Sequence, residues 1–358
     1  MKKKVLISTG GSGGHVIPAT IIFEHLKNKF HVFLETDKRG EVFIDSKKYT
    51  YKVFSSIKLD IFFKFPIVIY KFILIFFNSL NYLKKNNFNI VISTGGYMSV
   101  PTCLAAKLLG LDIFLFEPNM VIGRSNRLFL KFAKKVFCYS SDLKNFPKKN
   151  FNKIKTIPSL LRKELYEFKN IKKENKKNFR ILIIGGSQAA KIFEQKLVPL
   201  ILELSKKFDI FIYHQIKNNE EKYKEISNIY QNSRINFKLF NFEKNIHEYI
   251  FDSDLVITRA GASTLAELVY LNTPFIAVPF SYSKDNHQLE NAFYYKKKNC
   301  CWVFEEKDFF KENSNNFLLN LIKNTSDLAE KKENMKKISY QNTWNNINEI
   351  LTKTLNEN

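Results

Sequence analysis

A glycine-rich turn near the start of the chain, between an apolar run and a helix, is the feature that most constrains the fold. Residues 5–19 read VLISTGGSGGHVIPA, with four glycines between the apolar run 5–7 and Pro18, a residue that suits a first helical turn. Glycines let the backbone approach another molecule closely, and a helix start presents unpaired N–H groups to an anion, usually a phosphate. The stretch therefore predicts a parallel α/β sheet with an anion site at the end of its first strand.

The spacing of these glycines bears on one common alternative, a dinucleotide site. That fingerprint needs glycine at its first, third and sixth positions, and counting from Gly11 the sixth position is Val16. Glu35 ends the next apolar run, where the ribose-binding acid of such a site would lie. A nicotinamide enzyme remains an alternative that rests on Glu35 alone.

Length and charge narrow the class of protein. The chain has 358 residues, of which 45% are hydrophobic, so it can fill two domain cores. Its net charge of +23 favours an anionic partner, which is a membrane phospholipid, a nucleic acid or a phosphorylated substrate. Because no arginine-rich arm or aromatic nucleic-acid motif is present, we expect no nucleic-acid partner. The cysteines lack the spacing of a metal site, so we expect no metal and no cofactor and interpret them as buried thiols: Cys103, Cys138, Cys300 and Cys301.

The first half of the chain repeats the opening pattern of strand, loop and helix. Further apolar runs predict strands of one parallel, doubly wound sheet at 31–34, 89–93 and 112–116. The second of these runs leads into a Thr-Gly-Gly-Tyr loop, 94–97, which would add a second set of backbone donors at the same sheet edge. Two tight turns without a ligand are the alternative. Glu117 and Asn119 follow the third run, where they could bind hydroxyls and phosphate or cap a helix.

The most apolar part of the chain, residues 61–83, allows two interpretations. Lys64, Pro66 and Lys71 interrupt it, which argues against a helix that spans a bilayer. One interpretation is a buried core helix. The other is a helix that also presents aromatic surface to a bilayer, where Lys64, Lys71, Lys84 and Lys85 would each gain about 1 kcal/mol from anionic headgroups.

A second α/β series follows a polar, lysine-rich segment. We interpret residues 163–178 as a linker, and we predict later strands at 180–184, 209–213, 235–240, 254–258 and 274–278. The domains would then be 1–162 and 179–335, with a final helix at 336–358 that packs back toward the first domain.

Two polar segments in this second series look suited to a nucleotide sugar. Small and hydroxyl residues at 259–264 open a helix that carries Glu267, a pattern that fits a diphosphate with a carboxylate for ribose hydroxyls. Ordinary compensation of the helix dipole would also explain Glu267. The amide-rich segment 285–288 follows the next strand and could bind sugar hydroxyls or begin a solvated helix.

Five motifs in the same order carry a resemblance to a known family. They are Thr-Gly-Gly-Ser-Gly-Gly-His-Val at 9–16, Thr-Gly-Gly-Tyr at 94–97, Gly-Gly-Ser-Gln at 185–188, Arg-Ala-Gly-Ala-Ser-Thr at 259–264 and Asp-Asn-His-Gln at 285–288. Over nearly its full length the chain resembles the MurG family, peripheral membrane glycosyltransferases of peptidoglycan synthesis. The resemblance implies a GT-B fold, in which two Rossmann-like domains face each other across a cleft.

The resemblance also implies an activity and its location. The family transfers N-acetylglucosamine from UDP-GlcNAc, with inversion, to the C4 hydroxyl of the muramoyl sugar of lipid I (undecaprenyl-pyrophosphoryl-MurNAc-pentapeptide), which gives lipid II. It acts at the cytoplasmic face of the bacterial inner membrane. By position, these residues match substrate-contacting positions of the family: Ser12, Gly13, Gly14, Asn119, Arg162, Ser187, Ala262, Ser263, Thr264, Leu265, Ala266, Glu267 and Gln288.

The chemistry of such a transfer agrees with the residues present. Helix N-termini and Arg162 could stabilise the charge of the leaving diphosphate without a metal. His15 is the natural base for the attacking hydroxyl, although a histidine in a glycine loop can also bind a phosphate. The alternatives are another GT-B enzyme, such as a glycolipid glycosyltransferase or a UDP-GlcNAc 2-epimerase, and a non-catalytic basic protein that binds membranes.

Overall fold

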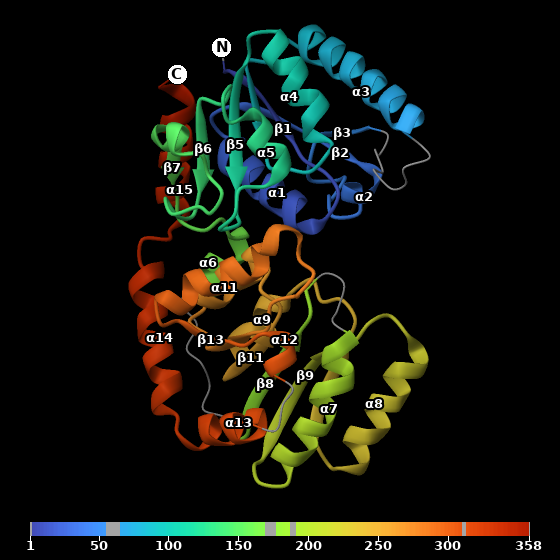
Figure 1. Cartoon of the computed structure of the whole chain (residues 1–358), viewed down its shortest axis with the longest axis vertical. Coiled ribbons are helices and arrows are strands. Elements are labelled where there is room, and N and C mark those ends of the chain that lie inside the picture. Colours follow the sequence, from blue (N-terminus) through green and yellow to red (C-terminus); the bar gives the residue numbers. More distant parts are fainter. Residues whose placement is uncertain (1, 55–64, 169–176, 187–190, 310–312, 358) are drawn as a thin grey trace. The chain divides into compact units, whose positions relative to one another are not determined.

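The computed structural model describes residues 2–54, 65–168, 177–186, 191–309 and 313–357. The chain divides into two compact units, and each is built around one parallel sheet with helices on both faces (Figure 1). Unit 1 comprises Met1–Arg162 and Asn342–Asn358, and unit 2 comprises Lys163–Gln341. The prediction of two doubly wound, Rossmann-like α/β domains is confirmed.

The sheet of unit 1 has the strand order β3-β2-β1-β4-β5-β6-β7, and all its pairings are parallel. Its strands are β1 (Lys4–Ser8), β2 (His31–Asp37), β3 (Tyr51–Phe54), β4 (Ile90–Ser93), β5 (Asp112–Glu117), β6 (Lys135–Cys138) and β7 (Ile154–Thr156). Val5, Leu6 and Ile7 are fully buried, as an apolar strand between two helical layers requires. The strand order reverses between β1 and β4, so the loops that follow these two strands lie at the switch point where open α/β sheets bind ligands.

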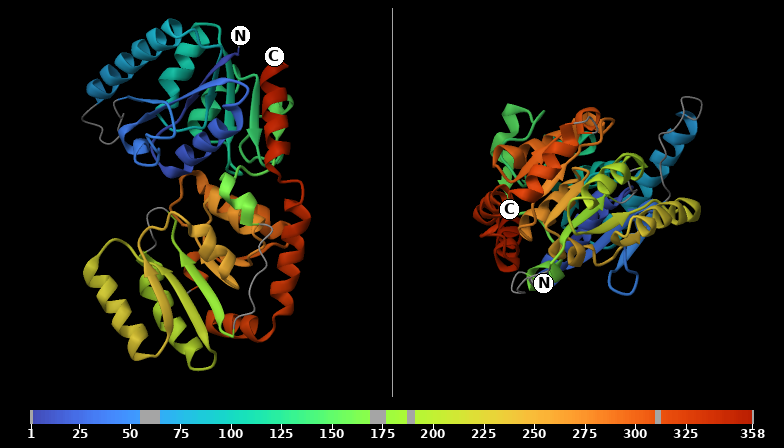
Figure 2. Two further views of the ribbon diagram at one scale, coloured as in Figure 1. Left: turned by 180° about the vertical axis from the view of Figure 1, so that it is seen from behind. Right: turned by 90° about the horizontal axis from the view of Figure 1, so that it is seen from below.

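The helices of unit 1 cover both faces of this sheet. They are α1 (Gly13–Leu26), α2 (Lys38–Glu41), α3 (Phe65–Lys85), α4 (Ser99–Leu108), α5 (Arg124–Phe129), the 3-10 helix η2 (Lys148–Lys153) and α15 (Trp344–Asn356). Helix α3 packs on α4 and lies on the outer side of the unit (Figures 1 and 2). None of the described helices combines the length and hydropathy that crossing a bilayer requires.

The sheet of unit 2 has the order β10-β9-β8-β11-β12-β13 and is also parallel throughout. Its strands are β8 (Phe179–Ile184), β9 (Ile210–Gln215), β10 (Asn236–Phe240), β11 (Leu255–Thr258), β12 (Phe275–Ala277) and β13 (Cys301–Val303). The helices are α6 (Lys163–Phe168), α7 (Lys191–Ser205), α8 (Glu220–Asn232), α9 (Ile246–Asp252), α10 (Ala262–Tyr270), η3 (Lys284–Asn286), α11 (His287–Lys297), α12 (Glu306–Phe309), α13 (Asn313–Lys323) and α14 (Ser326–Ser339). The switch point here lies between β8 and β11.

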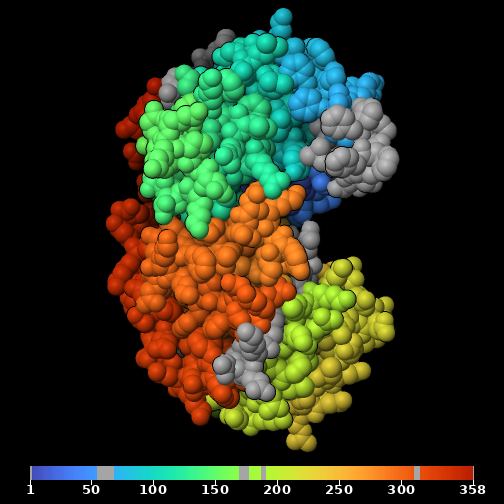
Figure 3. Space-filling model, in the orientation of Figure 1, coloured from blue at the N-terminus to red at the C-terminus, as the bar shows by residue number. Residues whose placement is uncertain are grey.

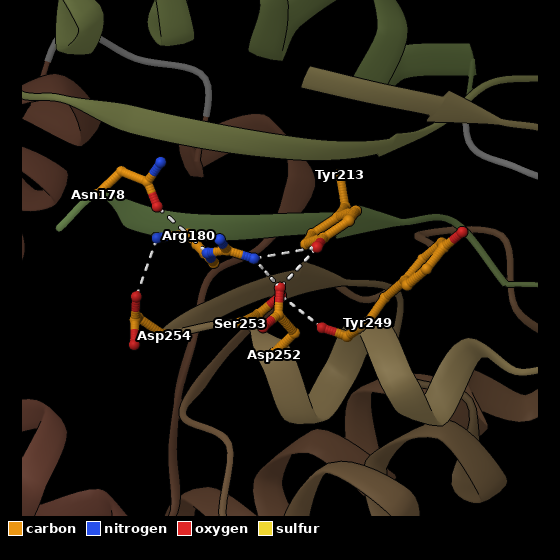
Figure 4. A network of polar contacts seen from close by, with 7 residues as sticks. All are labelled: Asn178, Arg180, Tyr213, Tyr249, Asp252, Ser253 and Asp254. Carbon is orange, nitrogen blue, oxygen red and sulfur yellow. Dashed lines mark hydrogen bonds and ion pairs between the residues drawn. The ribbon is translucent and has the colours of Figure 1, made fainter. Parts of the chain in front are cut away.

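A half-buried polar network joins the first residues of β8 to the end of α9 and to the segment that follows it (Figure 4). The Arg180 amide donates to Asp254 Oδ2 at 2.9 Å, and the Arg180 guanidinium forms an ion pair with Asp252. The Tyr213 hydroxyl donates to the same Asp252 carboxylate at 2.6 Å. Burial and the neighbouring Asp252 raise the pKa of Tyr213, so the phenol keeps its proton and remains a donor.

The boundaries between the units differ from those expected at two places. The expected linker, 163–178, begins with helix α6 of unit 2, because Leu165 is fully buried and the Tyr166 ring lies 5.1 Å from that of Tyr270. Residues 169–176 lie outside the described part. The expected final helix, 336–358, is two helices, since α14 continues to Ser339 within unit 2 and α15 begins at Trp344.

The last helix returns to unit 1 and packs on α1 (Figure 2). The Trp344 ring stacks on His25, with ring centroids 3.7 Å apart. Burial lowers the pKa of His25 to about 4, so this imidazole is neutral near pH 7. The contact joins the first helix of the chain to the last.

Candidate active site

The two glycine loops of unit 1 are in direct contact at the switch point. Gly96 has a φ of +86°, and a Cβ placed on it would lie 2.7 Å from the Gly10 carbonyl oxygen. A side chain at position 96 would therefore push the loops apart. Gly10 is equally close packed, because its Cβ would lie 3.0 Å from the Cβ of Met98.

His15 lies on the first turn of α1 and is held by the second loop. Its Nδ1 is 2.9 Å from the Thr94 carbonyl oxygen. A carbonyl oxygen can only accept, so Nδ1 carries the proton of the neutral imidazole and Nε2 keeps its lone pair. Glycine at position 95 leaves room for the ring, since a Cβ there would lie 3.0 Å from both Cε1 and Nδ1 of His15. The geometry presents Nε2 as a hydrogen-bond acceptor.

The start of α1 lies beside this histidine. Ser12 is the N-cap, its side chain makes no capping bond, and the first turn contains no acidic residue. The first intrahelical bonds run from the amides of His15 and Val16 to the Ser12 carbonyl oxygen, which leaves the amides of Gly13 and Gly14 ahead of them. An anion at this end would meet backbone donors and the positive end of the helix dipole.

Glu117 fixes the loop that carries Asn119. Glu117 is 2% exposed, and its Oε1 accepts from the Asn119 amide at 3.2 Å and from Asn119 Nδ2 at 3.0 Å. Its Oε2 accepts from the amide of Gly123 at 2.8 Å and from Asn126 Nδ2 at 3.1 Å. The carboxylate therefore holds the side-chain amide of Asn119 in one orientation.

Asn126 has a structural role that the sequence did not reveal. It is 1% exposed, and its Oδ1 accepts from the Ser93 hydroxyl at 3.2 Å, while the Gly95 amide donates to that same hydroxyl at 3.2 Å. Through these bonds Asn126 joins α5 to the second glycine loop. The sequence offered one signal of this structural role, which is that Asn126 lies one helical turn from buried apolar residues.

Glu35 lies in the interior of unit 1. It is 1% exposed and accepts from the Ser8 hydroxyl at 2.6 Å, on the neighbouring strand. Burial raises the pKa of this carboxyl to about 7. Because the side chain is enclosed by the sheet and its helices, it cannot reach the ribose of a bound dinucleotide, and the alternative that rested on Glu35 is wrong.

Arg162 ends unit 1 and is half-buried. The residues before it are anchored, because Leu160 and Leu161 are 3% and 1% exposed and the Leu160 amide donates to the Tyr139 hydroxyl at 3.0 Å.

In unit 2 the loop after β8 is fixed by a residue that the sequence did not single out. Gln215, at the end of β9, accepts from the Gly185 amide at 2.9 Å and donates from Nε2 to the Asn241 carbonyl oxygen at 3.0 Å. Gly186 has a φ of +81°, which favours glycine. Ser187 lies outside the described residues.

Helix α10 begins directly after the loop that follows β11. Gly261 is its N-cap, and the first intrahelical bond runs from the Leu265 amide to the Gly261 carbonyl oxygen at 3.0 Å. The amides of Ala262, Ser263 and Thr264 precede that bond, so they are the donors an anion would meet.

The six predicted positions on α10 divide by burial. Leu265 and Ala266 are 0% and 2% exposed, so their side chains belong to the core and offer no surface to a substrate. Ala262, Ser263, Thr264 and Glu267 are half-buried at the open side of the helix.

Gln288 joins two loops at this edge of the sheet. Its Oε1 accepts from the Ala260 amide at 3.3 Å and from the Phe280 amide at 3.0 Å. The segment before it is turned sharply, with φ values of 54° at Asp285 and 55° at Asn286. The amide-rich motif thus braces the loop before α10, and the Nε2 group of Gln288 has no acceptor among the described residues.

Comparison with known proteins decides the family. The glycosyltransferase family 28 N-terminal domain matches residues 5–138, and the family's C-terminal domain matches residues 180–345. A UDP-N-acetylglucosamine–N-acetylmuramyl-(pentapeptide) pyrophosphoryl-undecaprenol N-acetylglucosamine transferase of Pelagibacter ubique is 45% identical over 362 residues, which cover 100% of both chains. The chain belongs to the MurG family of glycosyltransferases. The transferase of the same name from Rickettsia bellii is 33% identical and covers 94% of this chain and 95% of its own.

Solved structures place this MurG-family chain in a broad fold group. Acinetobacter baumannii MurG matches with a TM-score of 0.76 and 22% identity, over 99% of this chain and 100% of that one. The UDP-GlcNAc 2-epimerase of Neisseria meningitidis, solved with UDP-GlcNAc, matches with a TM-score of 0.67 and 15% identity over 99% and 100% of the two chains. At these identities the likeness establishes the shared GT-B fold alone.

Arg259, the first residue of the fourth motif in this MurG-family chain, is a structural residue. It is 8% exposed, donates from Nη1 to the Val278 carbonyl oxygen at 3.0 Å and forms an ion pair with Glu306 at 2.6 Å. Its guanidinium also lies over the ring of Phe193, 4.9 Å from the centroid. Arg259 therefore clamps the ends of β11 and β12 to α12 and is not directed at a substrate.

Proposed function

We propose that this chain transfers N-acetylglucosamine from UDP-GlcNAc to the C4 hydroxyl of the muramoyl sugar of lipid I, which gives lipid II for peptidoglycan synthesis. The observation that carries the proposal is the 45% identity, over the whole of both chains, to a transferase named for that reaction. The glycosyltransferase family 28 domains matched in both halves agree with it.

We assign the donor to unit 2. The amides of Ala262, Ser263 and Thr264 bind the diphosphate of UDP-GlcNAc, since they precede the first intrahelical bond of α10. Glu267 lies about one turn further along the helix, and we assign it to the ribose hydroxyls of the donor. The Nε2 group of Gln288 donates to the sugar, because its Oε1 is already occupied by two backbone amides. We retain Ser187 as a donor contact from the family resemblance.

Leu265 and Ala266 contribute to donor binding through the backbone of α10. Their buried side chains fix the first turn of the helix against the sheet. A contact with the nucleotide from either residue would come from the main chain.

We assign the acceptor to unit 1, where His15 acts as the general base. As the C4 oxygen of the muramoyl sugar attacks the anomeric carbon of GlcNAc, Nε2 takes the hydroxyl proton, the new C–O bond forms and the bond to UDP breaks. The anomeric configuration inverts in this single displacement. The Thr94 carbonyl oxygen stabilises the imidazolium that forms, because it accepts from Nδ1 throughout.

The other residues of unit 1 position the acceptor and the leaving group. The loop residues Ser12, Gly13 and Gly14 bind the acceptor diphosphate, and the Asn119 amide, oriented by Glu117, binds a sugar hydroxyl. Arg162 supplies positive charge to the phosphates.

Helix α3 provides the surface that contacts the cytoplasmic face of the inner membrane. Tyr70, Ile73, Leu74 and Phe77 are 65%, 47%, 43% and 60% exposed, and their spacing places them in one stripe on the helix. An exposed apolar stripe of this kind marks an interaction surface. Figure 3 shows α3, in light blue, at the surface of unit 1. Of the lysines predicted to meet anionic headgroups, Lys71, Lys84 and Lys85 are exposed, and Lys64 lies outside the described residues.

The reaction is tested by UDP release from UDP-GlcNAc with and without a short-chain lipid I analogue. Wild-type protein should release UDP only with acceptor, and His15→Ala should lower kcat by about 10²–10⁴-fold. His31→Ala removes an exposed histidine of β2 and is the matched control. Release without acceptor would indicate an epimerase or hydrolase, and no release would indicate a binding protein. If His15 only bound a phosphate, its loss would raise the KM for the acceptor and leave kcat unchanged.

The membrane surface is tested by sedimentation with phosphatidylglycerol vesicles at low salt. Ile73→Asp combined with Phe77→Asp should lower vesicle binding by about tenfold or more, because each apolar side chain contributes roughly 1.5 kcal/mol or more on burial. Tyr223→Asp removes an aromatic side chain of α8 that is 45% exposed and should have no effect. Equal binding by all three proteins would contradict the assignment of α3.

A further inference from the structure

The first glycine loop is held by a buried carboxylate. Asp37 ends β2, its side chain is fully buried, and its Oδ1 accepts from the amides of Gly11 and Gly40, each at 2.9 Å. Although burial alone would raise it, hydrogen bonds from both amides and from Arg39 hold the pKa of Asp37 below its usual value. A fixed negative charge therefore lies directly against the loop that the proposed function assigns to an anion.

Arg39 balances that charge at the same place. Its Nε and Nη2 donate to Asp37 Oδ2 at 3.0 and 2.8 Å. The side chain is 44% exposed, and its Nη2 lies 3.9 Å from the position that a Cβ on Gly11 would occupy. A guanidinium has five N–H donors, so three of them have no acceptor among the described residues.

The close packing of Gly40 in α2 fixes the helix that carries the Arg39 guanidinium. Gly40 packs so closely that a Cβ on it would lie 2.2 Å from Thr36 Oγ1 and 3.0 Å from a methyl group of Val16. The short helix can therefore fold against the strand end only with glycine at position 40. This close packing turns Arg39, the preceding residue, back toward Gly11 and Asp37.

We propose that Arg39 binds the diphosphate of the lipid I acceptor at the first glycine loop, with Asp37 as the residue that orients it. The inference rests on the proposed function and adds a substrate contact to it. Phosphate oxygens match the planar, multiply donating face of a guanidinium. Without Arg39, the Asp37 carboxylate would repel the diphosphate from the loop. The diphosphate is assigned to the acceptor because the donor contacts lie in unit 2, whereas Arg39 and its partners lie in unit 1.

The test measures steady-state transfer by Arg39→Gln and by Lys38→Gln. Lys38 is the exposed neighbour on α2, so its loss removes the same charge from the same helix. Arg39→Gln should raise the KM for a diphosphate-linked acceptor by about 10- to 100-fold, as expected for the loss of charge-assisted hydrogen bonds. The KM for UDP-GlcNAc should stay within about twofold of wild type. Lys38→Gln should leave both values unchanged.

A second acceptor distinguishes the loss of a phosphate contact in Arg39→Gln from a structural effect of that substitution. With a monophosphate-linked analogue the penalty of Arg39→Gln should fall to below about threefold, because part of the contacted anion is gone. Arg39→Lys should restore part of the affinity, since it keeps the charge and loses the paired geometry. Equal penalties for the two acceptors, a fall in kcat with unchanged KM, or equal effects of Lys38→Gln would overturn the inference. If wild-type protein does not use the diphosphate acceptor at all, the proposed function fails and this inference fails with it.

Discussion

Replacing Glu35 by glutamine removes a carboxyl whose charge is penalised by burial beneath the first glycine loop. The side chain is 1% exposed, and burial raises its pKa from 4.5 to about 7. The folded protein keeps this proton up to about pH 7, whereas the unfolded chain releases it above about pH 4.5. The free energy of unfolding should therefore fall as the pH rises between these values and remain lower above them.

The size of the effect follows from the shift. One pKa unit corresponds to about 1.4 kcal/mol, so the wild-type protein should lose about 2–3 kcal/mol of stability at this site between pH 5 and pH 8. Glutamine is neutral throughout this range and can still accept from the Ser8 hydroxyl. The stability of Glu35→Gln relative to wild type should rise by the same amount over that interval.

Urea unfolding at pH 5, 6, 7 and 8 measures this difference. The chain has two tryptophans, so a Trp302→Phe background leaves Trp344 in α15 as a fluorescence reporter of unit 1. Glu349→Gln, which removes an exposed carboxyl of the same unit, should keep the wild-type pH dependence. If the stabilities of Glu35→Gln and wild type change in parallel with pH, the argument from burial is refuted.

Three further substitutions test contacts described above. Gly96→Ala should destabilise unit 1 by about 1–3 kcal/mol and abolish transfer, because position 96 has a φ of +86° and a Cβ there would lie 2.7 Å from the Gly10 carbonyl oxygen. Calorimetry should show that this variant still binds UDP-GlcNAc. Trp344→Ala should cost about 2–3 kcal/mol of unit 1 stability, measured by circular dichroism during urea unfolding, since it removes the ring stacked on His25. Asp252→Asn should lower the free energy of unfolding of unit 2 by about 1.5–3 kcal/mol, as measured by Trp302 fluorescence during urea unfolding. An unchanged unfolding midpoint would contradict the role given to the network in Figure 4.

The fold was predictable from the sequence where strands are buried on both faces. The runs at 5–7, 89–93 and 180–184 are mostly apolar and lead into glycine loops, and they correspond to β1, β4 and β8. The strands β3, β6, β7 and β13 were not predicted. Each of the first three carries a lysine within three or four residues, and such short, interrupted runs cannot be distinguished from loops by periodicity.

The sequence identified the loops of the candidate site, but it did not identify the side chains that form hydrogen bonds with them. Glycines marked the loops at strand ends, because the backbone conformation and close packing of these loops require glycine. The bonds of Asp37 to Gly11 and of Gln215 to Gly185 join the ends of neighbouring strands, and the bond between Asn126 and Ser93 joins α5 to β4. The tertiary arrangement that brings these partners together is not visible along the chain. Gly40 has the same limit, because its need for glycine comes from the close approach of Thr36 Oγ1, which the sequence does not reveal.

The return of the last helix to unit 1 has a consequence for biosynthesis. Residues 2–162 leave the ribosome first, yet the α1 surface around His25 remains uncovered until Trp344 has been made. Unit 2 is continuous in the chain, so it can complete its core while unit 1 still waits for its final helix. A released chain that ended before residue 342 would therefore contain the whole of unit 2 and a unit 1 that lacks α15, with the α1 surface around His25 uncovered.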